Sequence, residues 1–267
     1  MRFFALIFVI VAALFYFSFN TETQRTDALY ERAESGEVLA QKQLGAQLMN
    51  ANGVEQNYHE AEKWLRQAAE QGDAEAQGLL GVMYRDGLGR EADDNEALTW
   101  FKLSAEQGLL ESQTFLAAMY EEGRGTAINY DEAVKWYSLA ADRDNAIAQN
   151  SLGMMYLVGR GVPQDYAKGR ELIRTAAARG YPRAIYHLGY IHEHGIGGEK
   201  DLDNALKLYK NAASQDFAAA NYRLGQMHLE GIGTEVQPQK AKDYFTKACE
   251  LGEQEACNGL GTTSFTQ

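Results

Sequence analysis

The residues of this sequence whose types and spacing could support chemistry are paired glycines, clustered histidines and two cysteines. The stretch LGVMYRDGLG, Leu80 to Gly89, places Gly87 and Gly89 just after an apolar run, with one residue between them. Such a pair could approach a pyrophosphate, but the dinucleotide-binding fingerprint also needs a third glycine and a preceding strand. A lone GxG pair is therefore weak evidence for a phosphate site.

The glycine pair is one copy of a repeat with a fixed period. Leucine recurs every 36 residues without an insertion, at Leu44, Leu80, Leu116, Leu152, Leu188, Leu224 and Leu260. A small residue follows each of these leucines, and the later copies keep the GxG pair, as in Gly123 with Gly125 and Gly159 with Gly161. Self-similarity at a fixed spacing is typical of repeat architectures. We therefore expect the glycines to end helices rather than to bind phosphate.

Each repeat shows the periodicity of two helices. The first carries an apolar stripe, which in the second repeat is formed by Ala76, Leu79, Leu80, Met83 and Tyr84. Residues at this spacing share one face of a helix. Asp93 is placed to cap the next helix, with Glu96 three residues further on, and Gly108 supplies a left-handed stop. Each repeat is therefore predicted to be a helical hairpin.

The clustered histidines are explained by the repeat better than by metal binding. His187, His192 and His194 lie close together and resemble a metal site. However, His192 and His228 occupy the repeat position that a tyrosine fills in earlier copies, so we expect them to be core substitutes. The sequence predicts no metal ligand and no cofactor.

Motifs for catalysis are also missing from the sequence. It contains no SxxK, GxSxG or HExxH motif, and the segment HEAEK at His59 has lysine where HExxH requires its second histidine. We therefore predict no catalytic residues and no enzymatic activity.

Charge argues against nucleic acid as a partner. The 267 residues include 37 Asp and Glu against 25 Lys and Arg, which gives a net charge of −12 and a pI near 4.9. Phosphate contacts require clustered basic residues, which this balance does not favour. The acidic residues are interpreted as solvating the outer helix faces.

The repeat resembles the Sel1-like repeat, a relative of the tetratricopeptide repeat. The segment AQNSLGMMYLVGRGVPQDYAKGRELIRTAAARG, Ala148 to Gly180, is similar to the family pattern AxxxLGxMYxxGxGVxxDxxKAxxWYxxAAxxG. The resemblance implies an all-α, right-handed superhelical solenoid of about six 36-residue helix-turn-helix repeats. We expect a partial helix within 21–39, six repeats over 40–255, and a truncated helix with a tail over 256–267.

An apolar segment precedes the repeats. Phe3 to Phe19 is an uninterrupted run of 17 mainly apolar residues, about 25 Å long if helical. We expect residues 1–20 to form a membrane anchor, because the segment LFYFSFN offers no good small-x-small cleavage site. The alternative is a cleaved signal, which would leave a soluble periplasmic or secreted protein.

The two cysteines fall at the end of the last repeat, in KACELGEQEACNGLG. This segment resembles cysteine-rich Sel1 proteins, in which a pair at this spacing forms a disulfide between adjacent helices. The resemblance implies a bond between Cys249 and Cys257, and a disulfide would indicate an oxidising compartment, the periplasm or a lumen. The alternative is two buried free thiols in a cytosolic protein.

The sequence favours a binding function over an enzymatic one. Stacked hairpins form a concave surface suited to recognition, so we predict a membrane-tethered scaffold that binds another protein or peptide there. Alignment with the tetratricopeptide pattern assigns to this wall Met154, Leu157, Tyr186, Tyr190, His194, Tyr222 and Leu229. Alanine at Tyr186, Tyr190 or Tyr222 is expected to weaken binding without lowering the melting temperature, whereas Arg85→Ala should do little. The alternatives are a binder of cell-wall or exopolysaccharide chains, a weak β-lactam hydrolase, and surface tyrosines without function.

Overall fold

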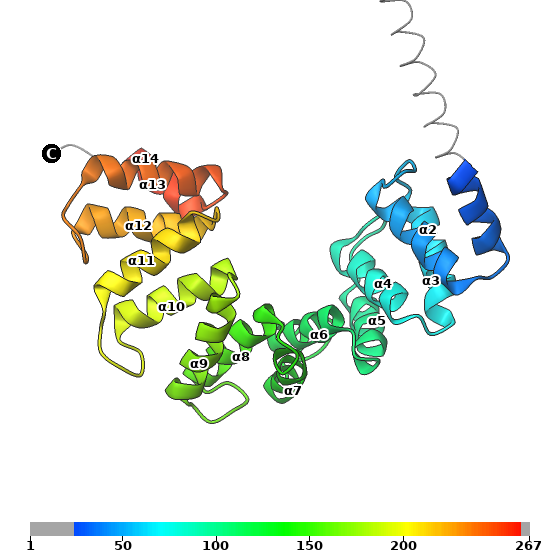
Figure 1. The fold of residues 1–267 in the computed structure, drawn as a ribbon, viewed down its shortest axis with the longest axis horizontal. Helices are drawn as coiled ribbons and strands as arrows, with labels where there is room; N and C mark the ends of the chain where they lie inside the picture. The colour runs from blue at the N-terminus through cyan, green and yellow to red at the C-terminus, as the bar shows by residue number, and fades with distance from the viewer. Residues whose placement is uncertain (1–23, 263–267) are drawn as a thin grey trace, which may run out of the picture. The chain divides into compact units, whose positions relative to one another are not determined.

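The computed structural model describes residues 24–262, and every regular element in that range is a helix (Figure 1). The chain divides into two compact units, residues 1–128 and 129–267, here called the first and second units. The first unit contains a helix over 24–34 and then α2 (Val38–Asn50), α3 (Tyr58–Glu70), α4 (Ala74–Asp86), α5 (Asp94–Glu106) and α6 (Leu110–Glu122). The second unit contains α7 (Tyr130–Ala141), α8 (Ala146–Val158), α9 (Tyr166–Ala178), α10 (Pro182–His194), α11 (Leu202–Ala213), α12 (Ala218–Glu230), α13 (Pro238–Glu250) and α14 (Gln254–Thr262).

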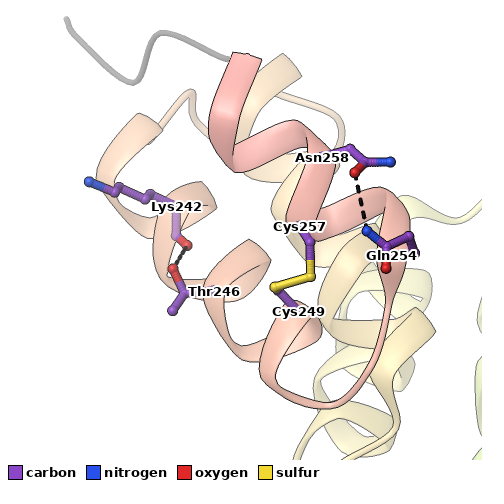
Figure 2. Close-up of a disulfide and its surroundings, with 6 residues drawn as sticks. All are labelled: Lys242, Thr246, Cys249, Gln254, Cys257 and Asn258. Carbon is purple, nitrogen blue, oxygen red and sulfur yellow. Dashed lines mark hydrogen bonds between the residues drawn. A yellow bond between two sulfur atoms is a disulfide. The ribbon is translucent and has the colours of Figure 1, made fainter.

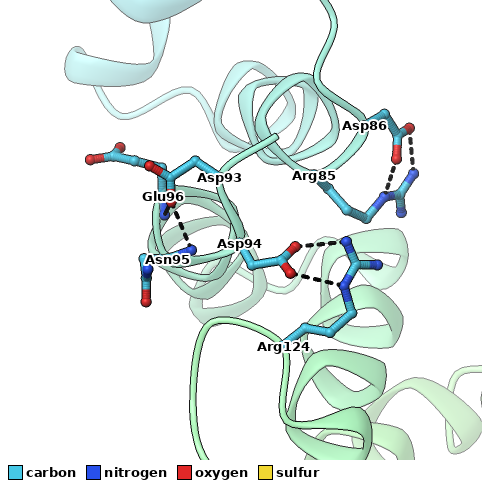
Figure 3. Close-up of polar contacts among 7 residues, drawn as sticks. All are labelled: Arg85, Asp86, Asp93, Asp94, Asn95, Glu96 and Arg124. Atoms are coloured by element: carbon cyan, nitrogen blue, oxygen red, sulfur yellow. Dashed lines mark hydrogen bonds and ion pairs between the residues drawn. The ribbon is translucent and has the colours of Figure 1, made fainter. Parts of the chain in front are cut away.

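Local sequence explains where the helices begin. The second helices of the first five repeats start after capping side chains: Asn57 accepts a hydrogen bond from the Glu60 amide at 3.1 Å, and Asp93 accepts from the amides of Asn95 and Glu96 (Figure 3). These bonds satisfy amide groups that the first helical turn leaves without a partner. The caps that the sequence suggested are therefore formed. The second helix of the sixth repeat, α13, has no side-chain cap.

The GxG pairs end helices and allow close packing. Gly159 follows α8 with a φ of 73°, a left-handed conformation that costs glycine nothing. The second glycine of this pair, Gly161, lies against the start of α7, where a Cβ atom would be 2.6 Å from the carbonyl oxygen of Tyr130. The two glycines therefore have different roles: Gly159 ends the helix, and Gly161 allows a close contact with the start of α7.

A small residue on the first helix of a hairpin receives a large side chain from the second helix, an aromatic ring at Gly81 and Gly225 and an aliphatic side chain at Gly45 and Gly153. A Cβ atom at Gly81 would lie 2.6 Å from the ring of Phe101, and one at Gly225 would lie 2.7 Å from the ring of Phe245. Both rings are buried, with exposures of 0% and 4%. This interlock holds α4 on α5 and α12 on α13, and consecutive helices pack on one another throughout each unit.

The single-pass membrane localisation expected from the sequence is corrected by the structure. Between residues 24 and 262 no helix has both the length and the apolar character needed to cross a bilayer. The labelled helices have at most 13 residues, about 20 Å at the usual rise per residue, against a hydrocarbon core of about 30 Å. The Phe3 to Phe19 segment, on which the expectation depended, lies outside the described residues.

A disulfide closes the last hairpin. Cys249, near the end of α13, is bonded to Cys257 in α14, with sulfur atoms 2.00 Å and Cα atoms 4.8 Å apart (Figure 2). No free cysteine is found in the described part of the chain. Ala248 and Ala256, which are both fully buried, belong to the same apolar cluster as the disulfide. The bond therefore fixes α14 against the end of the repeat array.

Candidate functional site

An apolar pocket of about 480 Å³ lies on the second unit, where the first helices of two successive repeats, α8 and α10, adjoin. Its lining consists of Met154, Leu157, Val158, Tyr166, Tyr186, His187, Tyr190, Ile191 and Ile196. Three of these are large apolar or aromatic side chains that remain open to solvent: Val158 is 51% exposed, Tyr166 43% and Tyr190 40%. Exposed apolar side chains gathered around a hollow are typical of interaction sites.

The repeat geometry explains why the pocket lies at this place. Val158 is the last residue of α8 and Tyr166 the first of α9, so the GxG turn brings the two ends together. Gly197, in the next GxG turn, packs against Tyr166. A Cβ atom added at Gly197 would lie 2.5 Å from the Cβ atom of Tyr166. Ile196, beside Gly197, thereby reaches the pocket wall.

His187 is the polar member of the lining. Its Nδ1 lies 2.8 Å from Oδ1 of Asn150, so the neutral ring donates this hydrogen bond and keeps Nε2 as an acceptor. Burial lowers the pKa of His187 from 6.5 to about 4, and the positive charge of Arg183 acts in the same direction. The imidazole is therefore uncharged at neutral pH, and the pocket contains no charged side chain.

Of the seven residues that the sequence assigned to a binding wall, Met154, Leu157, Tyr186 and Tyr190 line this pocket. Leu157 is 5% exposed and forms part of the floor. His194 lies outside the lining, but its ring stacks on that of Tyr190 with centroids 4.0 Å apart. These five residues are therefore neighbours on one surface.

Tyr186 has a structural role that the sequence did not reveal. Its ring packs against Tyr209 and Phe217, with centroids 5.4 and 5.5 Å away. Burial raises the pKa of its hydroxyl. The expectation that alanine at Tyr186 would leave the melting temperature unchanged conflicts with this packing.

Tyr222 and Leu229 lie away from the pocket. Tyr222 packs on Phe245 of α13 with ring centroids 5.6 Å apart, and both side chains belong to the cluster that contains Ala248 and Ala256. Their repeat positions match those of the pocket residues, but they face the last hairpin. The structure therefore does not bring all seven predicted residues together.

A largely buried ion pair joins α10 to α12. Arg223 donates to both carboxylate oxygens of Glu193, with Nε 3.0 Å from Oε2, and the Tyr209 hydroxyl donates to Oε2 at 2.7 Å. Burial favours the neutral carboxyl, but the hydrogen bonds from Arg223 and Tyr209 outweigh it and lower the pKa of Glu193. Glu193 is 6% exposed, and its carboxylate is paired with Arg223 rather than solvated.

The histidines do not assemble into a metal centre. No group of three His, Cys, Asp or Glu side chains in the described range is arranged to hold an ion. His228 is 1% exposed and stacks on Tyr244 with centroids 5.6 Å apart and ring planes 7° from parallel. It therefore occupies a core position.

Sequence reasoning missed a second apolar pocket, in the first unit. It measures about 400 Å³ and is lined by Glu75, Gly78, Leu79, Val82, Phe101, Leu109, Glu111, Ser112 and Phe115. Beside it, Arg85 pairs with Asp86 at 2.7 Å (Figure 3). The Arg85 guanidinium also lies over the ring of Phe115, 4.3 Å from its centroid. The signal that could have found this pocket is Phe115, an aromatic residue outside the positions assigned to the wall.

Comparisons with known proteins agree with this architecture. The Sel1 repeat model matches six consecutive segments, residues 38–73, 74–109, 110–145, 146–181, 182–217 and 218–253. A Sel1 repeat protein from Oxalobacter formigenes is 29% identical and superposes with a TM-score of 0.72, with 82% of this chain and 86% of that chain covered. A protective antigen present in uropathogenic Escherichia coli strains is 33% identical with a TM-score of 0.50, with 90% of this chain and 59% of that chain covered.

A third similar structure is that of an immunity protein from Pseudomonas aeruginosa. It is 20% identical with a TM-score of 0.54, over 80% of this chain and 82% of that chain, and shows likeness of fold alone. The search of curated proteins gave no match. With six repeats matched from residue 38 to residue 253, the chain belongs to the Sel1 repeat family.

Proposed function

We propose that this chain binds a segment of another protein at the apolar pocket between α8 and α10. Sel1 repeat proteins generally mediate protein–protein interactions and are typically non-enzymatic. The observation that carries the proposal is the pocket itself, in which Val158, Tyr166 and Tyr190 remain open to solvent beside a buried apolar floor. Binding energy in protein interfaces is concentrated where an apolar or aromatic anchor enters such a hollow.

In this proposal the first helices of the second unit form the concave wall of a right-handed superhelical array. Stacked helical hairpins create extended concave surfaces of this kind. Met154 and Leu157 on α8 and Tyr190 on α10 would contact the anchor side chain of the partner. His187 would accept a hydrogen bond through Nε2, because its Nδ1–H already donates to Oδ1 of Asn150.

Charge around the pocket favours an acidic partner segment. The repeat over 146–181 carries five Lys and Arg against two Asp and Glu, in a chain whose net charge is −12. Arg183 lies close enough to act on His187, and no carboxylate lines the pocket. We therefore expect the partner to present a large apolar side chain flanked by Asp or Glu.

Selection from a peptide display library on the immobilised full-length chain tests the proposal. The counter-selection uses Val158→Ser combined with Tyr190→Ala, two exposed side chains whose loss should not unfold the repeats. The selected peptides should share an apolar anchor with acidic neighbours and should fail to bind the double variant. Peptides that bind both proteins equally would refute the site. Retention of cell-wall glycan without peptide enrichment would replace the proposal with the polysaccharide alternative.

A further inference from the structure

An ion pair between neighbouring repeats shows how this fold holds a lysine side chain. Lys42 of α2 extends to the next repeat, where its Nζ lies 2.6 Å from Oε2 of Glu75 and 3.5 Å from Oδ2 of Asp73. The Lys42 side chain is 17% exposed, so its methylene stem is largely covered. The site therefore provides packing for the stem and carboxylates for the ammonium group.

The next repeat keeps one carboxylate of this arrangement but lacks the lysine. At a distance of 36 residues, Gly78 replaces Lys42, Leu109 replaces Asp73 and Glu111 replaces Glu75. The pocket of about 400 Å³ opens at this place, and all three residues line it. No basic side chain in the described range forms an ion pair with Glu111. The pocket thus repeats the surroundings of Lys42 without an internal cation.

The walls of this pocket suit a hydrocarbon stem. Val82, Leu109 and Phe115 line it, and the ring of Phe115 packs on that of Phe101 with centroids 5.1 Å apart. The pocket also contains the buried hydroxyl of Ser112, which is already hydrogen bonded to the hydroxyl of Ser104 at 2.7 Å. The floor therefore presents no unsatisfied polar group, and the charge available to a ligand is the carboxylate of Glu111.

The local cations do not fill the site. Arg85 is bound to both carboxylate oxygens of Asp86 at 2.7 and 2.8 Å, and Arg124 is bound to Asp94 at 2.6 Å (Figure 3). The repeat over 74–109 carries seven Asp and Glu against three Lys and Arg. The surroundings therefore attract an external cation.

We propose that this pocket of the first unit binds a lysine side chain in a segment of another protein. The stem lies against Val82 and Phe115, and the ammonium group pairs with Glu111 as Lys42 pairs with Glu75. The site is separate from the pocket between α8 and α10, and its charge preference is opposite.

Amide NMR titration of the full-length chain tests this inference with two short peptides. One has a single lysine between two leucines, and the other has norleucine, an uncharged residue with a similar stem, in place of the lysine. The lysine peptide should shift resonances of α4 and α6, and the norleucine peptide should bind about 5-fold more weakly, because it cannot pair with the carboxylate.

A matched pair of variants then identifies the carboxylate. Glu111→Gln should weaken the lysine peptide about 5-fold, whereas Glu106→Gln, which changes another exposed glutamate of the first unit, should leave its affinity unchanged. Shifts confined to residues outside 74–122, equal binding of the two peptides, or an unaltered affinity in Glu111→Gln would each overturn the site. Val158→Ser, at the other pocket, should have no effect, so the two proposals can fail separately.

Discussion

Tyr186 packs against Tyr209 with ring centroids 5.4 Å apart, which makes a residue of the pocket wall part of the core of the second unit. We predict that Tyr186→Ala lowers the free energy of unfolding by about 2–4 kcal/mol, since it removes a ring that also contacts Phe217. Tyr190→Ala is the control, because its side chain is 40% exposed and its loss should cost less than about 1 kcal/mol. Urea unfolding followed by circular dichroism measures both, and equal values would contradict this account of Tyr186.

His187 should make stability depend on pH. The unfolded chain takes up this proton near the ordinary pKa of 6.5, whereas the folded protein takes it up only near pH 4, because burial and Arg183 oppose the charge. The unfolded state therefore binds more protons between these values. Stability should be complete above pH 6.5 and fall by about 3 kcal/mol as the pH drops to 4.

The pH profile of His187→Gln checks this expectation. The difference in unfolding free energy between the wild type and this variant should shrink as the pH falls from 6.5 to 4. His59→Gln, which removes an exposed histidine of α3, is the matched variant for the loss of an imidazole. A constant difference between wild type and His187→Gln would show that His187 does not resist protonation.

The Cys249–Cys257 bond should stabilise the last hairpin. Closing a loop with a sequence separation of 8 contributes about 2–3 kcal/mol in the chain-entropy treatment. A variant with serine at both positions should therefore unfold at lower urea concentration, with the loss concentrated in α13 and α14. Labelling the unreduced, denatured wild type with a thiol reagent is the direct check, and two reactive thiols would contradict the bond.

Gly81→Ala separates packing from helix propensity. Alanine is the better helix former by about 1 kcal/mol, but its methyl group would lie 2.6 Å from the ring of Phe101, which is fully buried. Overpacking should outweigh propensity, and we expect a net loss of about 1–2 kcal/mol. Gly261→Ala in α14, where a Cβ atom meets nothing within 4 Å, should be neutral or slightly stabilising. Thermal unfolding compares them, and stabilisation by Gly81→Ala would contradict the interlock.

Features that depend on short-range chemistry were predictable from the sequence. The glycine pairs, the capping side chains and the apolar stripes act within one or two turns of the chain, so the helical hairpins follow from them. Membrane localisation was not predicted correctly: the expectation depended on the Phe3 to Phe19 segment, which lies outside the described residues, and no helix within residues 24–262 is long and apolar enough to cross a bilayer.

The candidate site was predictable only in part, because a repeat position specifies the direction of a side chain but not what it meets. Tyr186 and Tyr222 share a position with Asn150, yet one packs on Phe217 and the other on Phe245. The pocket of the first unit depends on Gly78 having no side chain, and its walls come from Leu109 and Phe115. Both outcomes depend on the residues that neighbouring helices supply. The position of a residue within its repeat does not specify these neighbours.

Binding of a protein segment in the pocket between α8 and α10 can be measured with two variants of the same helix. Val158 and Ile147 are both exposed apolar residues of α8, at 51% and 47%, but only Val158 lines the pocket. The measurement is the Kd of a display-selected peptide for Val158→Ser and for Ile147→Ser, by fluorescence anisotropy. We expect Val158→Ser to weaken binding about 5- to 10-fold and Ile147→Ser to leave it unchanged. Equal Kd values for the two variants would contradict binding in this pocket.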